Sequence, residues 1–519
     1  MTDVDLPGPG TDSQFKGQIL VGSRIIDSLS SGLYKDPAAC LKELVNNSFD
    51  ADASRVRVLV KPDADRIIIE DDGVGMTRDQ FVKHFSRISE SHKRDGSEYT
   101  ASGRPKIGKI GIGFIAANEL CEQMEIFSTT EGSTDLLHVT IDFELMRLPP
   151  EARKREGSSD YAKGDYQGEI LRADPDAHFT RIFLKQVRGT ARDILAGADA
   201  PVGGSRDHSL YGLRPDSIAR RLSSLDSWSS LDEYSQTMLG VALNVPVTYP
   251  DGWIAESYAD VVTPFEDQLE ALKFRVEYDG TALQKPVVLK ADESNSIIRG
   301  IELNGRHVGA RGYLYAQRGV LRPEDLNGVL IRIRNAAVGE YNNDFMGFPH
   351  AEGTLFQRWV TAEIYADDRL EDALNIDRRT LRDTHPAYVE LRKWFHDQLR
   401  DFLREVRREL HSKQSEQRKQ ERVTAEVDRI EAAAKRVGQT YGPSVQKVIT
   451  QAFTPPPPQA STPRPATSKM PRARSARQNI NKKFSVSELY EIVLEVAQET
   501  LTKETAQAFI EELTKRLRG

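Results

Sequence analysis

The sequence predicts an α+β protein, in which an α/β sandwich domain is followed by a second α/β domain, a long charged helix and a small helical segment. Three observations support this prediction: a helix followed by alternating strands near the N-terminus, a second mixed pattern after residue 256, and a charged helical stretch after residue 385. Since 519 residues are too many for one hydrophobic core, several domains are expected.

The composition is typical of a globular protein, with 39% hydrophobic and 29% charged residues. No apolar run reaches the roughly 20 residues of a membrane-spanning helix, and the N-terminus lacks the layout of a secretory signal. With only Cys40 and Cys121, a disulfide framework or a thiolate zinc site is excluded. We therefore expect a cytoplasmic protein that does not associate with membranes.

The first domain begins with a helix and two strands. Pro37 suits the first position of a helix, and the apolar residues Leu41, Leu44 and Val45 follow at helical spacing. The alternating stretches that come next predict strands, and their positions are residues 55–60, 66–70, 124–128, 138–143 and 181–184. The expected architecture is a helical layer on a mixed or antiparallel sheet.

The rest of the chain divides by composition. The second domain shows strand patterns near residues 274–278, 298–303 and 329–334. The predicted parts are a flexible leader (1–17), the sandwich domain (18–255), the second α/β domain (256–385), the charged helix (386–440), a Pro-rich basic linker (441–483) and a helical interaction or dimerisation segment (484–519).

The charged helix and the tail leave several possibilities open. The apolar positions Leu391, Phe395 and Leu399 could pack on the second domain or on another subunit, and the polar remainder suits a solvated helix or a coiled coil. The linker holds seven basic and no acidic residues between Arg464 and Lys483, which fits either attraction to nucleic-acid phosphates or a solubilising role.

The first candidate motif lies on the early helix. Glu43 and Asn47 are four residues apart, so they share one helix face while Leu41, Leu44 and Val45 cover the other. A carboxylate and an amide oxygen placed in this way can activate a water molecule and bind Mg²⁺. Taken alone, the pattern favours an ordinary polar helix face over a catalytic one.

The second motif, Asp71-Asp72-Gly73-Val74-Gly75-Met76, directly follows a strand. A carboxylate at the strand end can accept a hydrogen bond from an exocyclic amine, and the glycines allow the backbone to approach a flat ligand closely. The alternative is a tight turn made of common turn residues.

The third motif is a glycine loop that leads into a helix-compatible apolar run. Its candidate residues are Gly108, Lys109, Gly111, Gly113 and Phe114. Glycine amides at the start of a helix form a site for phosphate groups.

The three motifs, in this order and spacing, resemble those of the GHKL ATPases (gyrase B, the ninety-kilodalton heat-shock chaperone, histidine kinases and MutL), and the resemblance is strongest to the heat-shock-ninety-like branch. It implies the Bergerat α/β sandwich followed by a transducer-like domain, with ATP and Mg²⁺ as ligands. It implies that Glu43 is the general base and that Asn47 binds Mg²⁺.

The same resemblance assigns the remaining motif residues. Asp71 would bind the adenine amine, with Gly73, Gly75 and Met76 at the base pocket. The glycine loop from Gly108 to Phe114 would border the phosphates and close a mobile lid formed by residues 89–107.

Two further residues are assigned by resemblance. Thr180 is similar to a family threonine that opens a strand near the adenine, although Phe179 stands where the family usually has glycine. The loop around Arg378 is similar to the chaperone loop whose arginine reaches the γ-phosphate, with Arg379 as the alternative.

The resemblance implies a slow ATPase that works as a nucleotide-gated clamp and forms a homodimer on ATP binding. Three targets are compatible with the sequence: a protein client remodelled in a chaperone-like way, DNA bound by a clamp like those of the MORC and MutL branches in genome defence or maintenance, or a partner recruited through residues 484–519.

Overall fold

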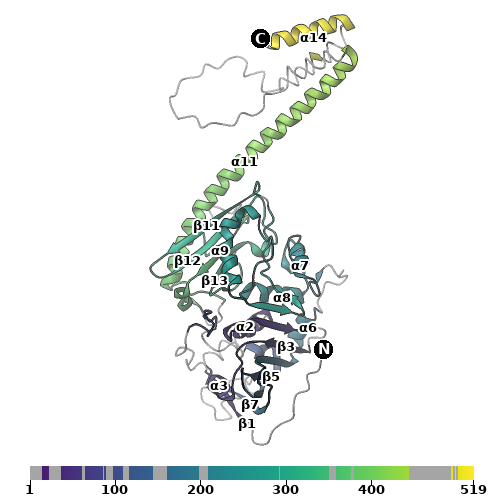
Figure 1. Cartoon of the computed structure of the whole chain (residues 1–519). Helices are drawn as coiled ribbons and strands as arrows, with labels where there is room; N and C mark the ends of the chain where they lie inside the picture. The colour runs from purple at the N-terminus through teal and green to yellow at the C-terminus, as the bar shows by residue number, and fades with distance from the viewer. Residues whose placement is uncertain are drawn as a thin grey trace. The chain divides into compact units, whose positions relative to one another are not determined.

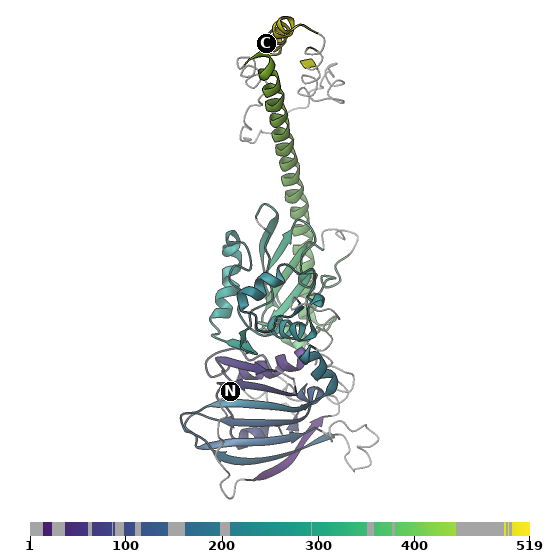
Figure 2. The ribbon, with the colours of Figure 1, turned by 90° about the vertical axis from the view of Figure 1, so that its right-hand side faces the viewer.

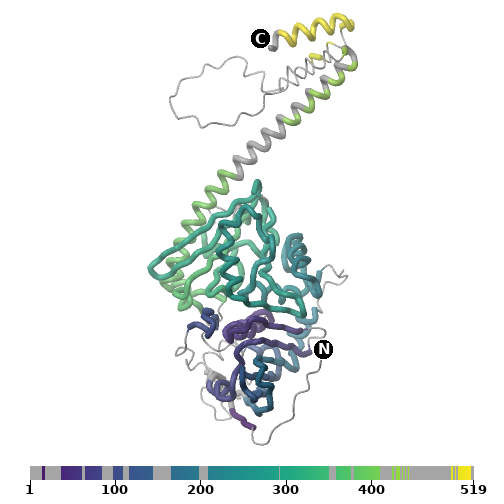
Figure 3. Tube along the Cα trace, viewed as in Figure 1, coloured from purple at the N-terminus to yellow at the C-terminus, as the bar shows by residue number. Residues whose placement is uncertain are grey.

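The computed structural model describes residues 14–22, 37–60, 65–85, 87–88, 98–108, 116–143, 161–197, 208–291, 293–349, 358–375, 379–442, 493–494, 497 and 501–518, and the other residues are grey in Figure 3. The chain forms two compact units, Met1–Arg407 and Arg408–Gly519. None of the helices in the described ranges combines the length and the apolar character that crossing a membrane requires.

The first unit contains a ten-stranded mixed sheet (Figures 1 and 2) with the strand order β10-β9-β2-β3-β8-β5-β6-β7-β1-β4. Only the β1–β4 and β2–β9 pairs are parallel. The strands are β1 (Phe15–Gly22), β2 (Arg55–Leu59), β3 (Arg66–Asp71), β4 (Arg87–Ile88), β5 (Cys121–Thr129), β6 (Asp135–Asp142), β7 (Tyr161–Arg172), β8 (Phe179–Val187), β9 (Arg275–Tyr278) and β10 (Thr281–Ala282). Burial alternates along β2 and β3, as the sequence pattern predicts.

Helix α2 (Pro37–Asp50) lies at the centre of the helical layer and packs against α4, α6, α8 and strand β3. Leu41, Val45 and Phe49 on α2 are fully buried. The other helices of this part are α3 (Arg78–Phe85), α4 (Ala117–Leu120), α6 (Gly189–Ala196), α7 (Pro215–Leu222), η5 (Trp228–Ser230), α8 (Glu233–Asn244), η6 (Glu256–Tyr258) and α9 (Ala259–Glu270). The predicted α/β sandwich is therefore confirmed.

A second sheet of five strands follows, with the order β11-β12-β15-β13-β14. β13 and β15 run parallel, and every residue of both strands is buried, as expected for strands covered on both faces. The elements are β11 (Ser296–Asn304), β12 (Gly309–Gln317), η7 (Glu324–Leu326), β13 (Gly328–Ile333), β14 (Ala336–Ala337), β15 (Val360–Ala366) and η9 (Asp368–Ala373).

A fully buried ion pair lies inside the second sheet. Arg332 Nε on β13 donates to Glu363 Oε2 on β15 at 2.6 Å, and both side chains are 0% exposed. Tyr249 and Tyr341 donate their hydroxyl groups to the same carboxylate at 2.8 and 2.6 Å. Arg332 Nη1 also donates to the carbonyl oxygen of Leu243 at the end of α8, so the pair ties the second sheet to the helical layer.

One strand belongs to a different sheet from the one that the sequence predicts. The stretch 274–278 was expected in the second α/β domain, but β9 pairs in parallel with β2 of the first sheet. The periodicity identifies a strand but carries no information about its partner, which here lies more than two hundred residues earlier in the chain.

The start of the chain requires a second correction. Phe15, Lys16 and Gly17 fall within the predicted leader but form the first residues of β1, paired with β7. The Phe15 ring lies edge-on to Tyr166, with 6.2 Å between the ring centroids. Strand pairing and this apolar contact place these residues in the sheet. The Gly- and Pro-rich composition of the first residues predicted a flexible leader instead.

Helix α11 (Pro386–Tyr441) forms where the charged helix was expected. Within the first unit its apolar face is buried, with Leu391, Phe395 and Leu399 at 0% exposure. Arg299 of β11 lies over the Phe402 ring at 5.6 Å. Of the two predicted packing partners, the helix therefore uses the second domain of its own chain.

The second unit contains the remainder of α11 and helix α14 (Lys503–Arg518). On α14, Ala506, Ile510 and Thr514 are buried, which gives the helix one covered face. The basic residues Arg464–Lys483 lie outside the described residues.

Candidate functional site

The polar face of α2 carries the first motif. Most side chains of this helix are buried, but Glu43, Asn47 and Asp50 are half-buried. Their spacing of four and then three residues places them on one face. The predicted juxtaposition of Glu43 and Asn47 is therefore compatible with this helix, and Asp50 extends the same polar row.

Asp50 connects this helix face to the start of the glycine loop. Its carboxylate accepts hydrogen bonds from the backbone amides of Ile107 at 2.7 Å and Gly108 at 2.8 Å. Two amides bound by one carboxylate hold Ile107 and Gly108 against the end of α2. Sequence reasoning overlooked Asp50, although its position three residues after Asn47 was an available signal.

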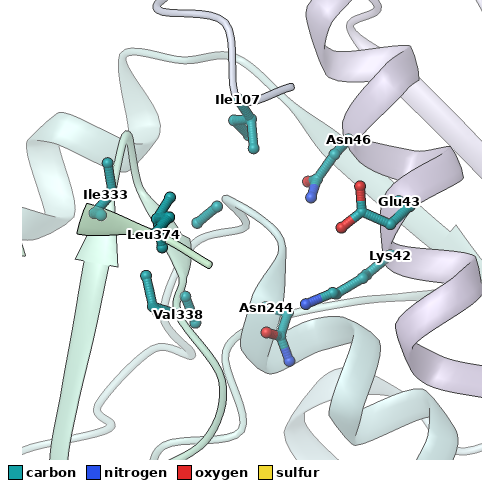
Figure 4. Close-up of a pocket in the computed structure, with 10 residues that line it drawn as sticks. Lys42, Glu43, Asn46, Ile107, Asn244, Ile333, Val338 and Leu374 are labelled. Carbon is teal, nitrogen blue, oxygen red and sulfur yellow. The ribbon is translucent and has the colours of Figure 1, made fainter. Parts of the chain in front are cut away.

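Glu43 lines a small cavity of about 10 Å³, which is about the least volume that holds one water molecule. Figure 4 shows its carboxylate directed toward this cavity, with Ile107, Val338 and Leu374 on other sides. The cavity wall therefore combines α2, the loop before Gly108 and the turn around β14. A carboxylate facing a water-sized cavity is a geometry that suits a general base.

The second motif supplies a buried carboxylate, and its hydrogen-bond donors in the described part of the chain are uncharged. Asp71 ends β3 and is 5% exposed. It accepts hydrogen bonds from Ser48 Oγ at 2.7 Å and from the Gly73 amide at 3.0 Å. Burial raises the pKa of Asp71 to about 6, and these hydrogen bonds only partly counter that effect. A ligand that donates a hydrogen bond would stabilise the charged form of this carboxylate.

The two motif glycines are required by the protein's own packing. A Cβ on Gly73 would lie 2.6 Å from the Ala51 carbonyl oxygen, and one on Gly75 would lie 2.0 Å from that of Thr129. Gly75 also has a φ of +69°, which glycine adopts most readily. The sequence predicts that these glycines let the backbone approach a ligand closely. The structure shows close approach to the backbone of the same chain, and the ligand role stays a prediction.

Thr180 lies beside Asp71, to which it is paired across β8 and β3. Its hydroxyl group is 3.0 Å from Ser128 Oγ, and the Met76 amide donates to the same serine oxygen at 2.9 Å. The structure thus brings Asp71, Met76 and Thr180 into one polar cluster with Ser128, which sequence reasoning had not included.

Several predicted residues lie outside the described part of the chain, and their roles stay predictions. In the glycine loop these are Lys109, Gly111, Gly113 and Phe114, and in the second domain Arg378. Of the expected lid, residues 98–107 are described and 89–97 are not.

Arg379, the alternative to Arg378, is described. It lines a larger cavity of about 730 Å³ together with Lys42 and Trp228. Its carbonyl oxygen would be 2.5 Å from a Cβ on Gly339.

The residues present fit a magnesium nucleotide. Asn47 offers an amide oxygen on the Glu43 face, and Mg²⁺ accepts few protein oxygens because it keeps several waters. Asp71 offers a carboxylate whose burial favours a donating ligand. Gly108, the first glycine of the third motif, is held by the Asp50 carboxylate.

Residues 34–148 match the family model described as "Histidine kinase-, DNA gyrase B-, and HSP90-like ATPase". This span contains α2, the Asp71 turn and the glycine loop. Residues 34–148 belong to the GHKL ATPase superfamily. The family prediction made from the three motifs is confirmed for this GHKL domain.

Curated relatives match only parts of the chain. The chaperone protein HtpG of Mesorhizobium japonicum is 27% identical over 161 residues, which cover 26% of this chain and 26% of HtpG. HtpG of Gluconobacter oxydans is 28% identical over 181 residues, covering 30% and 29%. These matches support the heat-shock-ninety-like branch of the superfamily.

A relative with a different name also matches. The putative type II restriction enzyme HgiDII of Herpetosiphon aurantiacus is 36% identical over 107 residues, which cover 21% of this chain and 17% of that protein. The chain therefore spans less than a third of the length of each of these relatives.

Proposed function

We propose that this chain is a magnesium-dependent ATPase whose nucleotide site lies between the polar face of α2 and the Asp71 turn. The observation that carries the proposal is the double role of α2. The helix presents Glu43 and Asn47 on the face from which Asp50 also binds the start of the glycine loop. The match of residues 34–148 to an ATPase family supports the same assignment.

In this proposal each residue has one task. Glu43 orients the attacking water and takes up its proton. Asn47 holds Mg²⁺, which when bound neutralises charge on the phosphate oxygens. Asp71 accepts the hydrogen bond of the adenine amine, and the amides of the glycine loop donate to the phosphates.

The hydrolysis cycle gates a clamp. ATP binding closes the lid, brings Arg378 to the γ-phosphate and favours a homodimer, and hydrolysis reverses these steps. Because only ATP carries the γ-phosphate, nucleotide identity biases the equilibrium between open and closed forms. The matches to HtpG chaperones favour a protein client as the target.

A second target is duplex DNA. The basic linker between Arg464 and Lys483 would attract phosphates without sequence preference, and the match to the putative restriction enzyme HgiDII points in the same direction.

The test is steady-state ATP hydrolysis by the whole chain and by its Glu43→Ala variant, with ATP binding measured by calorimetry. We expect Glu43→Ala to bind ATP within about threefold of the wild type and to lose roughly 10²- to 10⁴-fold in kcat. The control is Glu302→Ala, which removes an exposed carboxylate on β11. Equal hydrolysis by wild type and Glu43→Ala would remove Glu43 as the base.

The same assay separates the two targets. Stimulation of hydrolysis by an unfolded protein, with no response to duplex DNA, supports the chaperone-like clamp. Stimulation by duplex DNA supports the DNA clamp if it weakens steeply between about 50 and 200 mM salt. Several contacts to DNA phosphates would produce this salt dependence.

A further inference from the structure

The turn between β13 and β14 has an unusual backbone. Arg334 and Asn335 connect the paired residues Ile333 and Ala336, and their φ angles are +53° and +70°. Two consecutive left-handed residues make the tight hairpin turn that follows strand twist, in which the first position usually holds asparagine, aspartate or glycine. An arginine at this position adopts a backbone conformation that is unfavourable for a non-glycine residue, and it is held there by the contacts of its side chain.

The Arg334 side chain is 1% exposed and contacts two regions. Within the second domain, Nε donates to Asp368 Oδ1 at 2.9 Å, and Nη2 lies 3.2 Å from Glu371. Toward the GHKL domain, Nη1 donates to the carbonyl oxygen of Lys106, and Nη2 lies 3.6 Å from Glu98. Both of the latter residues belong to the expected lid.

Residues 106–108 are thus held from two sides. Arg334 binds the carbonyl of Lys106, while Asp50 on α2 binds the next two amides, those of Ile107 and Gly108. Three successive backbone groups leave little freedom for this segment, which leads directly into the predicted phosphate-binding glycines. Its position is therefore coupled to the position of the second sheet.

The same hairpin closes the cavity in front of Glu43. Ile333, Ala336 and Val338 line that cavity together with Ile107, whose amide is fixed by Asp50. Displacement of the hairpin would change the cavity at the point where the proposed base meets water.

We propose that Arg334 is a positioning residue, which locks the start of the glycine loop to the second domain and thereby sets the geometry around Glu43. This inference rests on the proposed ATPase function. Arg334 acts through Lys106 and the hairpin, and it is distinct from Arg378, to which the γ-phosphate contact is assigned. The lock couples movement of residues 106–108 to movement of the second sheet.

The test uses the whole chain with Arg334→Gln, which removes the charge and the fork of donors but keeps a side chain of similar length. We expect kcat for ATP to fall roughly 10- to 100-fold, because small displacements of a reacting site cost this much, while ATP affinity changes less than about threefold. In parallel, hydrogen exchange of the Ile107 and Gly108 amides in the nucleotide-free protein should accelerate at least about tenfold.

The control is Arg358→Ala, whose side chain is 60% exposed and pairs with Glu324 at 3.2 Å. This variant should retain both the kcat and the amide exchange of the wild type. If Arg334→Gln does not fold, Arg334→Lys decides, since it keeps the charge beside Asp368 and Glu371 but lacks the planar fork. Arg334→Lys should fold, and it should show a smaller fall in kcat and a smaller acceleration of amide exchange than Arg334→Gln.

The outcomes separate this inference from the ATPase assignment. Wild-type kcat and wild-type exchange in Arg334→Gln, or in Arg334→Lys if the former is unfolded, overturn the inference while hydrolysis stands. An equal acceleration of exchange across the whole first unit would indicate general destabilisation and also overturn it. If the wild type hydrolyses no ATP, the ATPase assignment fails, and the exchange of the two amides still decides whether Arg334 fixes the loop.

Discussion

Asp71 in the first sheet and Glu363 in the second are both buried carboxylates, but their partners differ in kind. Asp71 accepts from the Ser48 hydroxyl and from a backbone amide, both neutral donors, and burial raises its pKa to about 6. Burial would also raise the pKa of Glu363, but the charge and hydrogen bond of Arg332 outweigh it and lower this pKa to about 2.

The difference separates a structural carboxylate from a candidate binding carboxylate. Glu363 has an ion-pair partner and two tyrosine hydroxyls, so its negative charge is compensated inside the protein. The charge of Asp71 is compensated only in part, and the remainder is available to a ligand that donates a hydrogen bond. Burial alone does not distinguish the two residues, whereas the charge of their partners does.

The largest expected effect is on the structural side of this comparison. Arg332→Met leaves Glu363 buried without its hydrogen-bonded cation, and we expect a loss of about 3–5 kcal/mol in the free energy of unfolding at pH 7. Without Arg332, the pKa of Glu363 should rise above its ordinary value, so the loss should shrink as the pH falls and Glu363 takes up a proton. Urea unfolding at pH 7 and pH 5 measures both. A loss below about 1 kcal/mol would mean that the pair does not hold the second sheet.

The next prediction is a gain in the free energy of unfolding rather than a loss, and it concerns Asp71. Folding raises the pKa of Asp71 from 3.8 to about 6, so its neutral form stabilises the folded state below about pH 4, and this contribution is lost as the pH rises through 6. Asp71→Asn should therefore stabilise the nucleotide-free protein at pH 8 by up to about 3 kcal/mol, with no gain at pH 4. Thermal unfolding at the two pH values checks the sign.

The same variant should lose nucleotide affinity at pH 7.5, roughly 10- to 100-fold, because a hydrogen bond to a charged acceptor is removed. Asp72→Asn is the matched control. The neighbouring carboxylate accepts from Ser54 and Arg55, and although burial opposes the change, these hydrogen bonds lower the pKa of Asp72. Its replacement should lower stability and leave affinity unchanged. Equal effects of the two substitutions would contradict the comparison.

The smallest effect concerns Ser48, the hydroxyl donor to Asp71 at 2.7 Å. Ser48→Ala should cost about 1 kcal/mol of stability and raise the pKa of Asp71, since a hydrogen bond to its charged form is lost. Nucleotide affinity should then reach its plateau at a higher pH than in the wild type. Ser54→Ala, which removes a donor to Asp72 instead, should leave that pH dependence where it was.

Local features of the fold and site could be predicted from the sequence. Pro37 and the apolar spacing after it predicted α2, and the face shared by Glu43 and Asn47 followed from helix geometry. Asp71 was expected at a strand end and closes β3. In each case the signal lies within a few residues, where backbone periodicity dominates.

Long-range contacts could not be predicted in the same way. Arg334 reaches Lys106 across 228 positions, and its left-handed backbone has no clear signature in an Ile-Arg-Asn-Ala stretch. The packing of Gly75 against Thr129 likewise depends on a strand that pairs elsewhere in the sheet. Such contacts are set by tertiary structure, which a single sequence does not encode in any one segment.

The parallel pairing of β9 with β2 has a consequence for synthesis of the protein. β2 carries no site residue, but it lies directly beside β3, which ends in Asp71. Its other edge pairs with β9, where the backbone amides of Arg275 and Asp279 donate to the carbonyl oxygens of Ser54 and Val58. On the ribosome, that edge stays open until some two hundred further residues have emerged. An exposed strand edge invites pairing with other chains. Every motif that we propose to bind nucleotide, up to Thr180, is thus made well before the strand that protects the sheet behind it.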